Sequence, residues 1–113
     1  MTDRNTSTAS QIHVDKAFYM TFDGRRCYCA IPSLVVIHNS MKMHVKYKEN
    51  DEETYILTSK DGIHFMGSFI GGDDDSRVEF KKYQKGNSIV LAGAWKCGGR
   101  EGEWYIQGTM PVL

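Results

Sequence analysis

The sequence predicts an all-β protein, an antiparallel up-and-down meander of about eight strands that is closed or nearly closed into a small barrel. Turn-forming residues recur roughly every eight to twelve positions, and the apolar residues between them alternate with polar ones instead of following a helical repeat. A chain of 113 residues, of which 41% are hydrophobic, is typical of one globular domain. We expect residues 1–11 to be a disordered polar tail and residues 12–113 to form the barrel domain.

The first expected hairpin joins residues 16–22 to residues 26–31. The Asp23-Gly24 pair between them supplies the positive φ angles that a tight turn requires. The second of these strands ends at a proline, which has no N–H group to donate to a neighbouring strand. The apolar run over residues 34–38 is either a separate strand or the continuation of the previous one beyond this proline.

The middle of the sequence shows the clearest alternation. Residues 41–47 place methionine, valine and tyrosine on one side and lysine and histidine on the other, as in a strand with one buried and one solvated face. The charged segment over residues 48–53 is expected to be a loop that leads to a strand over residues 54–58. Asp61-Gly62 then marks another hairpin turn.

The second half of the chain contains the remaining expected strands. Residues 63–70 alternate apolar and polar side chains, and the glycine- and aspartate-rich segment over residues 71–76 is expected to be a loop. Residues 77–84 then direct a valine and a phenylalanine inward. The last hairpin combines residues 88–95 with residues 102–109 through the polar segment KCGGRE.

The inward face of the expected barrel is almost entirely large and apolar. Its members are Phe18, Met20, Phe22, Met41, Met43, Val45, Tyr47, Tyr55, Leu57, Phe65, Phe69, Val78, Phe80, Ile89, Leu91, Trp95, Trp104 and Ile106. An interior of this kind is either filled by its side chains or wide enough for one small ligand, and the sequence leaves both arrangements open. In a hollow barrel we expect Trp95, Trp104, Phe69, Tyr55 and Met43 to line the ligand site, because aromatic rings and flexible thioethers suit apolar ligands.

Glycine precedes an aromatic residue by two positions in several expected strands. The pairs are Gly67 and Phe69, Gly93 and Trp95, and Gly102 and Trp104. Glycine and ring then share one face, so that the glycine leaves space for a ring from the adjacent strand and lets the sheet coil. With the segments FMGSF, LAGAW and GEWYIQG, residues 63–109 resemble the strand pattern of avidin-like and other calycin-type β-barrels. The resemblance implies an up-and-down barrel with a pocket for a small apolar or amphipathic ligand at its open end.

Composition and charge narrow the classes of partner. The 14 basic and 14 acidic residues balance, so no overall field favours nucleic acid or an anionic membrane. No apolar run is long enough to span a bilayer. The cysteines Cys27, Cys29 and Cys97 are an odd number, which favours free thiols in a reducing cytoplasm over a disulfide framework. The C-x-C spacing is not that of a structural zinc site, so no metal or other cofactor is expected.

These observations favour a non-catalytic protein. The sequence contains no nucleophile elbow, no H-E-x-x-H pair and no phosphate-binding loop. The leading hypothesis is a small β-barrel that binds a small apolar or amphipathic molecule in its interior. The alternative is a protein-interaction module or homo-oligomer that uses the outer face of a filled barrel.

Overall fold

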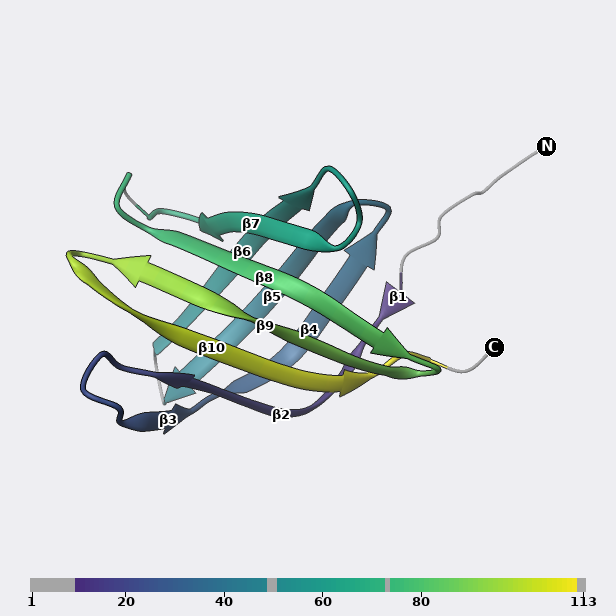
Figure 1. Ribbon diagram of the computed structural model, residues 1–113, viewed down its shortest axis with the longest axis horizontal. Helices are drawn as coiled ribbons and strands as arrows, with labels where there is room; N and C mark the ends of the chain where they lie inside the picture. The colour runs from purple at the N-terminus through teal and green to yellow at the C-terminus, as the bar shows by residue number, and fades with distance from the viewer. Residues whose placement is uncertain (1–9, 49–50, 73, 112–113) are drawn as a thin grey trace.

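The computed structural model describes residues 10–48, 51–72 and 74–111. In this part of the chain every regular element is a β-strand. The strands follow one another as β1 (Ser10–Gln11), β2 (His13–Met20), β3 (Arg26–Tyr28), β4 (Ala30–Ile37), β5 (Ser40–Lys48), β6 (Asp51–Ser59), β7 (His64–Phe69), β8 (Arg77–Lys85), β9 (Ser88–Cys97) and β10 (Arg100–Thr109). They form one curved sheet in which all paired strands are antiparallel (Figure 1). The all-β, antiparallel meander predicted from the sequence is therefore confirmed.

The sheet is an open half-barrel. Its strands lie side by side in the order β1-β4-β5-β6-β7-β8-β9-β10-β2-β3, so that β1 and β3 are the edge strands. One residue, Ile12, separates β1 from β2, and one residue, Cys29, separates β3 from β4. As a result β1 pairs with β4, whereas β2 pairs with β3 and β10. The predicted closure is wrong, because the sheet is open between its two edge strands. In the part of the chain that the structure describes there are ten strands instead of about eight, because these one-residue breaks divide longer strands.

The N-terminal strands begin earlier and run further than expected. Ser10 and Gln11 belong to the expected tail but form β1 against β4, while residues 1–9 lie outside the described residues. Strand β4 continues through Pro32 instead of ending there. Its register against β5 shifts around this proline, and such a bulge tolerates the missing N–H group.

Two expected loops are shorter in the structure because strand pairing extends into them. Glu52 lies opposite Lys46 in the β5–β6 ladder, so opposite charges stabilise a segment that the sequence suggested was a loop. Between β9 and β10 only Gly98 and Gly99 lie outside the strands, with φ angles of 59° and 80°. These positive angles suit glycine and close a two-residue hairpin turn.

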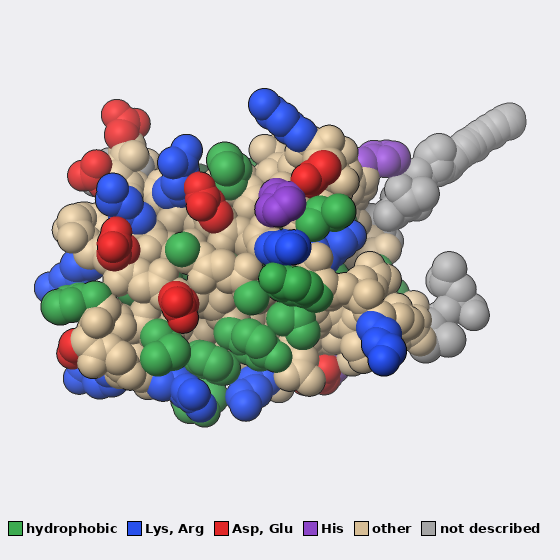
Figure 2. Space-filling model, in the orientation of Figure 1, with side chains coloured by type: hydrophobic (Ala, Val, Ile, Leu, Met, Phe, Trp, Pro, Cys, Tyr) green, Lys and Arg blue, Asp and Glu red, His purple; other side chains and the backbone are tan. Residues whose placement is uncertain are grey.

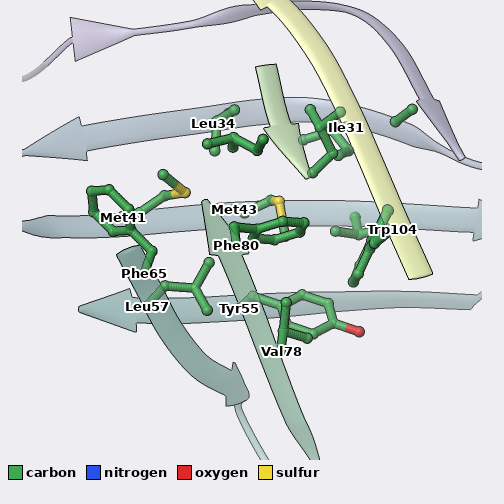
Figure 3. Close-up of a cluster of buried hydrophobic side chains, with 14 of the residues drawn as sticks. Ile31, Leu34, Met41, Met43, Tyr55, Leu57, Phe65, Val78, Phe80 and Trp104 are labelled. Carbon is green, nitrogen blue, oxygen red and sulfur yellow. The ribbon is translucent and has the colours of Figure 1, made fainter. Parts of the chain in front are cut away.

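One end of the half-barrel is filled with apolar side chains (Figure 3). Its most deeply buried residues are Ile12, Leu34, Met41, Met43, Val45, Leu57, Phe65, Leu91 and Ile106. Figure 3 shows Met41, Leu57 and Phe65 together on one side of this cluster, with Tyr55 and Trp104 on the other. The two ends of the interior are therefore lined by different chemistry, aliphatic and phenyl groups at one end and polar aromatic rings at the other.

The face of strand β2 that points to the interior is the opposite of the one expected from the sequence. Ala17 is buried and Tyr19 packs against the core, whereas Phe18 lies outside and stacks on Tyr105 with ring centroids 5.3 Å apart. Phe22 was also expected inside but is 78% exposed. Because β2 carries apolar residues on both faces, alternation alone does not choose between them. The aromatic partners available on each side decide the orientation.

Gly67, Gly93 and Gly102 mark places where neighbouring strands approach very closely. A Cβ atom at Gly93 would lie 1.7 Å from the carbonyl oxygen of Glu79, and one at Gly67 would lie 2.0 Å from a carbonyl oxygen of β6. A Cβ atom at Gly102 would lie 1.9 Å from a β2 carbonyl oxygen and 2.7 Å from Nε1 of Trp95. Close backbone approach therefore requires all these glycines, and space for a ring is an additional reason at Gly102.

Candidate functional site

The β2–β3 and β9–β10 turns lie at the same end of the half-barrel (Figure 1). A cavity of ≈ 680 Å³ is lined by residues of these turns and of the strands beside them. Residues of these turns, including Thr21, Asp23 and Gly98, form part of its mouth. Its wall contains aromatic side chains from six different strands: Tyr19, Tyr47, Tyr55, Phe69, Trp95 and Trp104. The half-barrel is thus filled at one end and hollow at the other, a combination of the two interiors that the sequence left open.

The structure brings together four of the residues that the sequence proposed for a ligand site. Trp95, Trp104, Phe69 and Tyr55 all line the cavity. Met43 does not, because it is completely buried in the filled part of the interior, where Figure 3 shows it beside the ring of Phe80. Alternation along β5 predicts which face of the strand is inward, but it does not predict the depth of a residue along the interior.

Sequence reasoning missed other residues of the cavity. Tyr19 was placed on the outer face of β2, and Tyr47 was predicted to face inward without being assigned to a ligand site. Tyr47 follows Val45 on the inward face of β5, so its position near the end of that strand was a usable signal. The basic residues of the mouth, among them Arg25 and Arg100, carried no signal because they are far apart in the sequence.

Trp104 is the centre of the aromatic wall. Its ring centroid lies 5.2 Å from that of Tyr55 and 5.7 Å from that of Phe80. The residue is only 3% exposed, and its indole N–H has no hydrogen-bond partner among the described residues. Buried donors are normally paired in folded proteins. The N–H itself is inaccessible and lies toward Cys29, which does not line the cavity, so the ring of Trp104 is the part that a ligand would contact.

A pair of hydrogen-bonded tyrosines forms the polar part of the wall. The hydroxyl groups of Tyr47 and Tyr55 share a hydrogen bond in which either can be the donor. Burial raises the pKa of both hydroxyls above their ordinary value, and it also raises the pKa of the nearby Glu53 carboxyl. In Tyr47 the bond to Tyr55 adds to this rise. The pair therefore stays protonated in the folded protein and offers neutral hydroxyl groups to the cavity.

We expect these two hydroxyls to make the folded state sensitive to alkaline pH. Above a pH of about 10 they ionise in the unfolded chain but stay protonated in the folded one, so stability is complete below that pH and falls as the pH rises. The slope is about 1.4 kcal/mol per pH unit for each hydroxyl that ionises only on unfolding. Urea unfolding at increasing pH measures the decline, and the Tyr47→Phe/Tyr55→Phe double variant should show a shallower one. Equal slopes for the two proteins would contradict the buried pair.

The cysteines lie close to the cavity. Cys27 and Cys97 line it, and burial raises the pKa of the neighbouring Cys29 thiol to about 11. The indole N–H of Trp104 lies toward this thiol and opposes the rise only weakly, because it makes no hydrogen bond of ordinary geometry and a thiol is a weak acceptor. All three cysteines are free thiols. Within the described ranges no cluster of histidine, cysteine, aspartate and glutamate side chains is suited to hold a metal ion.

The mouth of the cavity is mainly basic. Arg25, Arg77, Lys96 and Arg100 line it, with Asp23 as an acidic neighbour. The Asp23 carboxylate accepts a hydrogen bond from the Thr21 hydroxyl, which is the main reason that its pKa lies below the ordinary value; the charge of Arg25 contributes less. The cavity is consequently apolar and aromatic inside and positively charged at its opening.

The histidines of the strands lie outside this cavity. His44 contacts Glu52 at 2.5 Å on the outer side of the β5–β6 pair, and His64 contacts Asp61 at 2.7 Å beside the β6–β7 turn.

No helix in the described part of the chain is long and apolar enough to cross a membrane. A comparison with protein-family models finds no family that matches the chain, and a search of curated proteins finds no significant match.

Proposed function

We propose that the protein is a non-catalytic binder that takes a small apolar or amphipathic molecule into the open end of its half-barrel. The observation that carries the proposal is the ≈ 680 Å³ cavity with its aromatic wall and the hydroxyl pair of Tyr47 and Tyr55. Ligand pockets usually have volumes of about 300 to 1,000 Å³, with mostly apolar walls and a few polar groups that orient the ligand. The resemblance to avidin-like and calycin-type barrels, the cytoplasmic location and the absence of nucleic-acid or membrane partners stay predictions that accompany this proposal.

The walls define the chemistry of a suitable ligand. Tyr55 and Tyr19 contact Trp104 at steep interplanar angles of 79° and 69°, so the rings form an irregular apolar surface and not a flat slot. The hydroxyls of Tyr47 and Tyr55 are polar groups of this wall, and a hydrogen bond from one of them to an acceptor atom of the ligand would contribute about 0.5 to 1.5 kcal/mol. A small apolar molecule with one carbonyl or ether oxygen fits both requirements.

The chemistry of the lining supports binding over catalysis. The lining thiols, Cys27 and Cys97, are accompanied by no histidine, and Asp23 is the one carboxylate among the described lining residues. Cationic side chains are present in the lining, but a nucleophilic cysteine is commonly activated by an adjacent general base in a fixed geometry. Cys97 instead lies 3.6 Å from the Ser76 hydroxyl, which is not a base.

A matched pair of ligands tests the proposal. We expect isothermal titration calorimetry to detect binding of 2-acetylnaphthalene, whose carbonyl can accept from a hydroxyl of Tyr47 or Tyr55, and weaker binding of 2-ethylnaphthalene, which has the same shape and no acceptor. The Tyr47→Phe/Tyr55→Phe double variant keeps both rings in the wall but removes the donors. It should weaken binding of the ketone by about fivefold to tenfold and leave the hydrocarbon unchanged. If neither compound binds to the unmodified protein and other small apolar probes also fail, the proposal is wrong.

A second candidate function rests on the outer surface. Phe18, Tyr28 and Tyr105 form an aromatic row across β3, β2 and β10, and Tyr28 is 59% exposed. Figure 2 shows hydrophobic side chains gathered over this part of the molecule, with lysine and arginine side chains around them. An exposed apolar patch of this kind suits contact with a protein partner or a second copy of the chain. Light scattering on the unmodified protein and on Tyr28→Ser would show whether the row mediates self-association.

A further inference from the structure

We infer that the ligand of the cavity is an amphipathic anion, with its apolar part among the aromatic rings and its carboxylate or phosphate group at the mouth beside Arg25 and Arg100. The inference rests on the proposed function and specifies its ligand class. It begins from the mouth, where Arg25, Arg77, Lys96 and Arg100 outnumber the single carboxylate of Asp23. These basic residues come from the β2–β3 turn, the start of β8, the end of β9 and the start of β10, and only the fold brings them together.

Two of these cations belong to the outer face of the sheet. Arg77 and Lys96 are cross-strand partners, and alternation along β8 and β9 places both on the face opposite to the buried Val78. Carboxylates accompany them there: an oxygen of Glu79 lies 3.8 Å from the guanidinium Nε of Arg77, and Glu101 is the cross-strand partner of Lys96. Arg100, by contrast, pairs with Cys97 and shares the face of β10 that carries Trp104, so it belongs to the inner face at the mouth.

The other two cations of the mouth have no such partner. Within the described ranges Arg25 and Arg100 take part in no ion pair with a carboxylate. Asp23, the one carboxylate of the lining, already accepts the Thr21 hydroxyl. Two positive charges therefore stand at the opening of an apolar cavity.

The opposite wall determines which way such a ligand lies. Glu53 is close to the hydroxyls of Tyr47 and Tyr55, so a negative group placed at that side would meet a carboxyl group in surroundings that disfavour charge. The rings of Phe69 and Trp95 offer apolar surface between that side and the mouth. An anionic group at the mouth and an apolar body inside is consequently the favoured orientation.

Ligands that share one alkyl chain test the inference. Titration calorimetry at low salt compares decanoate, decyl phosphate, decan-1-ol and decyltrimethylammonium. We expect each anion to bind at least tenfold more tightly than the alcohol, the cation to bind weakest, and the preference for anions to shrink as the salt concentration rises. Equal affinity for decanoate and decan-1-ol overturns the inference while the proposed function stands. Failure of every compound to bind overturns both.

Charge-removing variants locate the anionic group. In Arg25→Gln/Arg100→Gln the ratio of decanoate affinity to decan-1-ol affinity should fall about tenfold. The matched control is Lys85→Gln, because Lys85 is an exposed cation that lies far from the mouth, at the end of β8 opposite Ser88. Its affinity ratio should equal that of the unmodified protein. A double variant that keeps the full preference, or a control that loses as much of it, shows that the mouth does not hold the anion.

Discussion

Replacing Gly93 with alanine should destabilise the protein by about 3 kcal/mol or prevent folding. The new methyl group would lie 1.7 Å from the carbonyl oxygen of Glu79 and 2.9 Å from the Cα atom of Phe80. Both are backbone atoms of β8, so no side-chain rotation relieves the contact, and β8 and β9 must separate. Urea denaturation followed by tryptophan fluorescence measures the loss as a lower unfolding midpoint.

Ala94→Ser is the matched control for this substitution. Ala94 is the next residue of β9, and its side chain is exposed on the outer face. Adding one atom there meets no neighbouring backbone, so the midpoint should change little. Equal midpoints for Gly93→Ala and Ala94→Ser would mean that β8 and β9 do not approach as closely as the structure indicates.

Truncating two phenylalanines of β7 should have very different effects on stability. Phe65 is 1% exposed in the filled end of the half-barrel, and Phe65→Ala is expected to cost about 3 to 5 kcal/mol, since it leaves an enclosed void. Phe69 lies on the same face of the same strand but borders the open cavity, where its ring centroid lies 5.6 Å from that of Tyr55. Phe69→Ala enlarges a space that is already open and should cost no more than about half as much.

The comparison of these two variants tests the arrangement of the interior. Denaturation curves for both proteins supply the free energies of unfolding. In addition, Phe69→Ala should change the affinity for apolar ligands, because its ring is part of the cavity wall. Equal losses of stability would indicate that the interior is filled at both ends, and the proposed ligand site would then have no room.

Local patterns were sufficient for much of the fold. Strict alternation over residues 41–47 predicted β5, which extends one residue beyond that range at each end. Asp23-Gly24 predicted a turn, and Gly24 indeed has a φ of 83° with its N–H donating to the Thr21 carbonyl at 2.9 Å. Such features depend on the residue itself and on its immediate neighbours, so they can be read without knowing the partners.

Other features depended on partners that are distant in the sequence. The orientation of β2 follows from the stacking of Phe18 on Tyr105, and the local sequence around Phe18 supports either orientation. Met43 was assigned to the ligand site because it faces inward, but its depth depends on the register of β5 against β4 and β6. Register is set by the whole sheet. The sequence therefore predicted correctly that Met43 faces the interior, but not that it lies in the filled part, away from the cavity.

The sequence by itself determined the strand content, the antiparallel meander, most of the turns and the aromatic character of the interior, because alternation and glycine placement act over a few residues. Only the tertiary structure decided that the sheet stays open, that one end is hollow, and that Arg25, Arg77, Lys96 and Arg100 meet at its mouth. These properties arise from the curvature and register of all ten strands together. A shift of one residue in any strand would exchange its inner and outer faces, and no short segment of sequence contains that information.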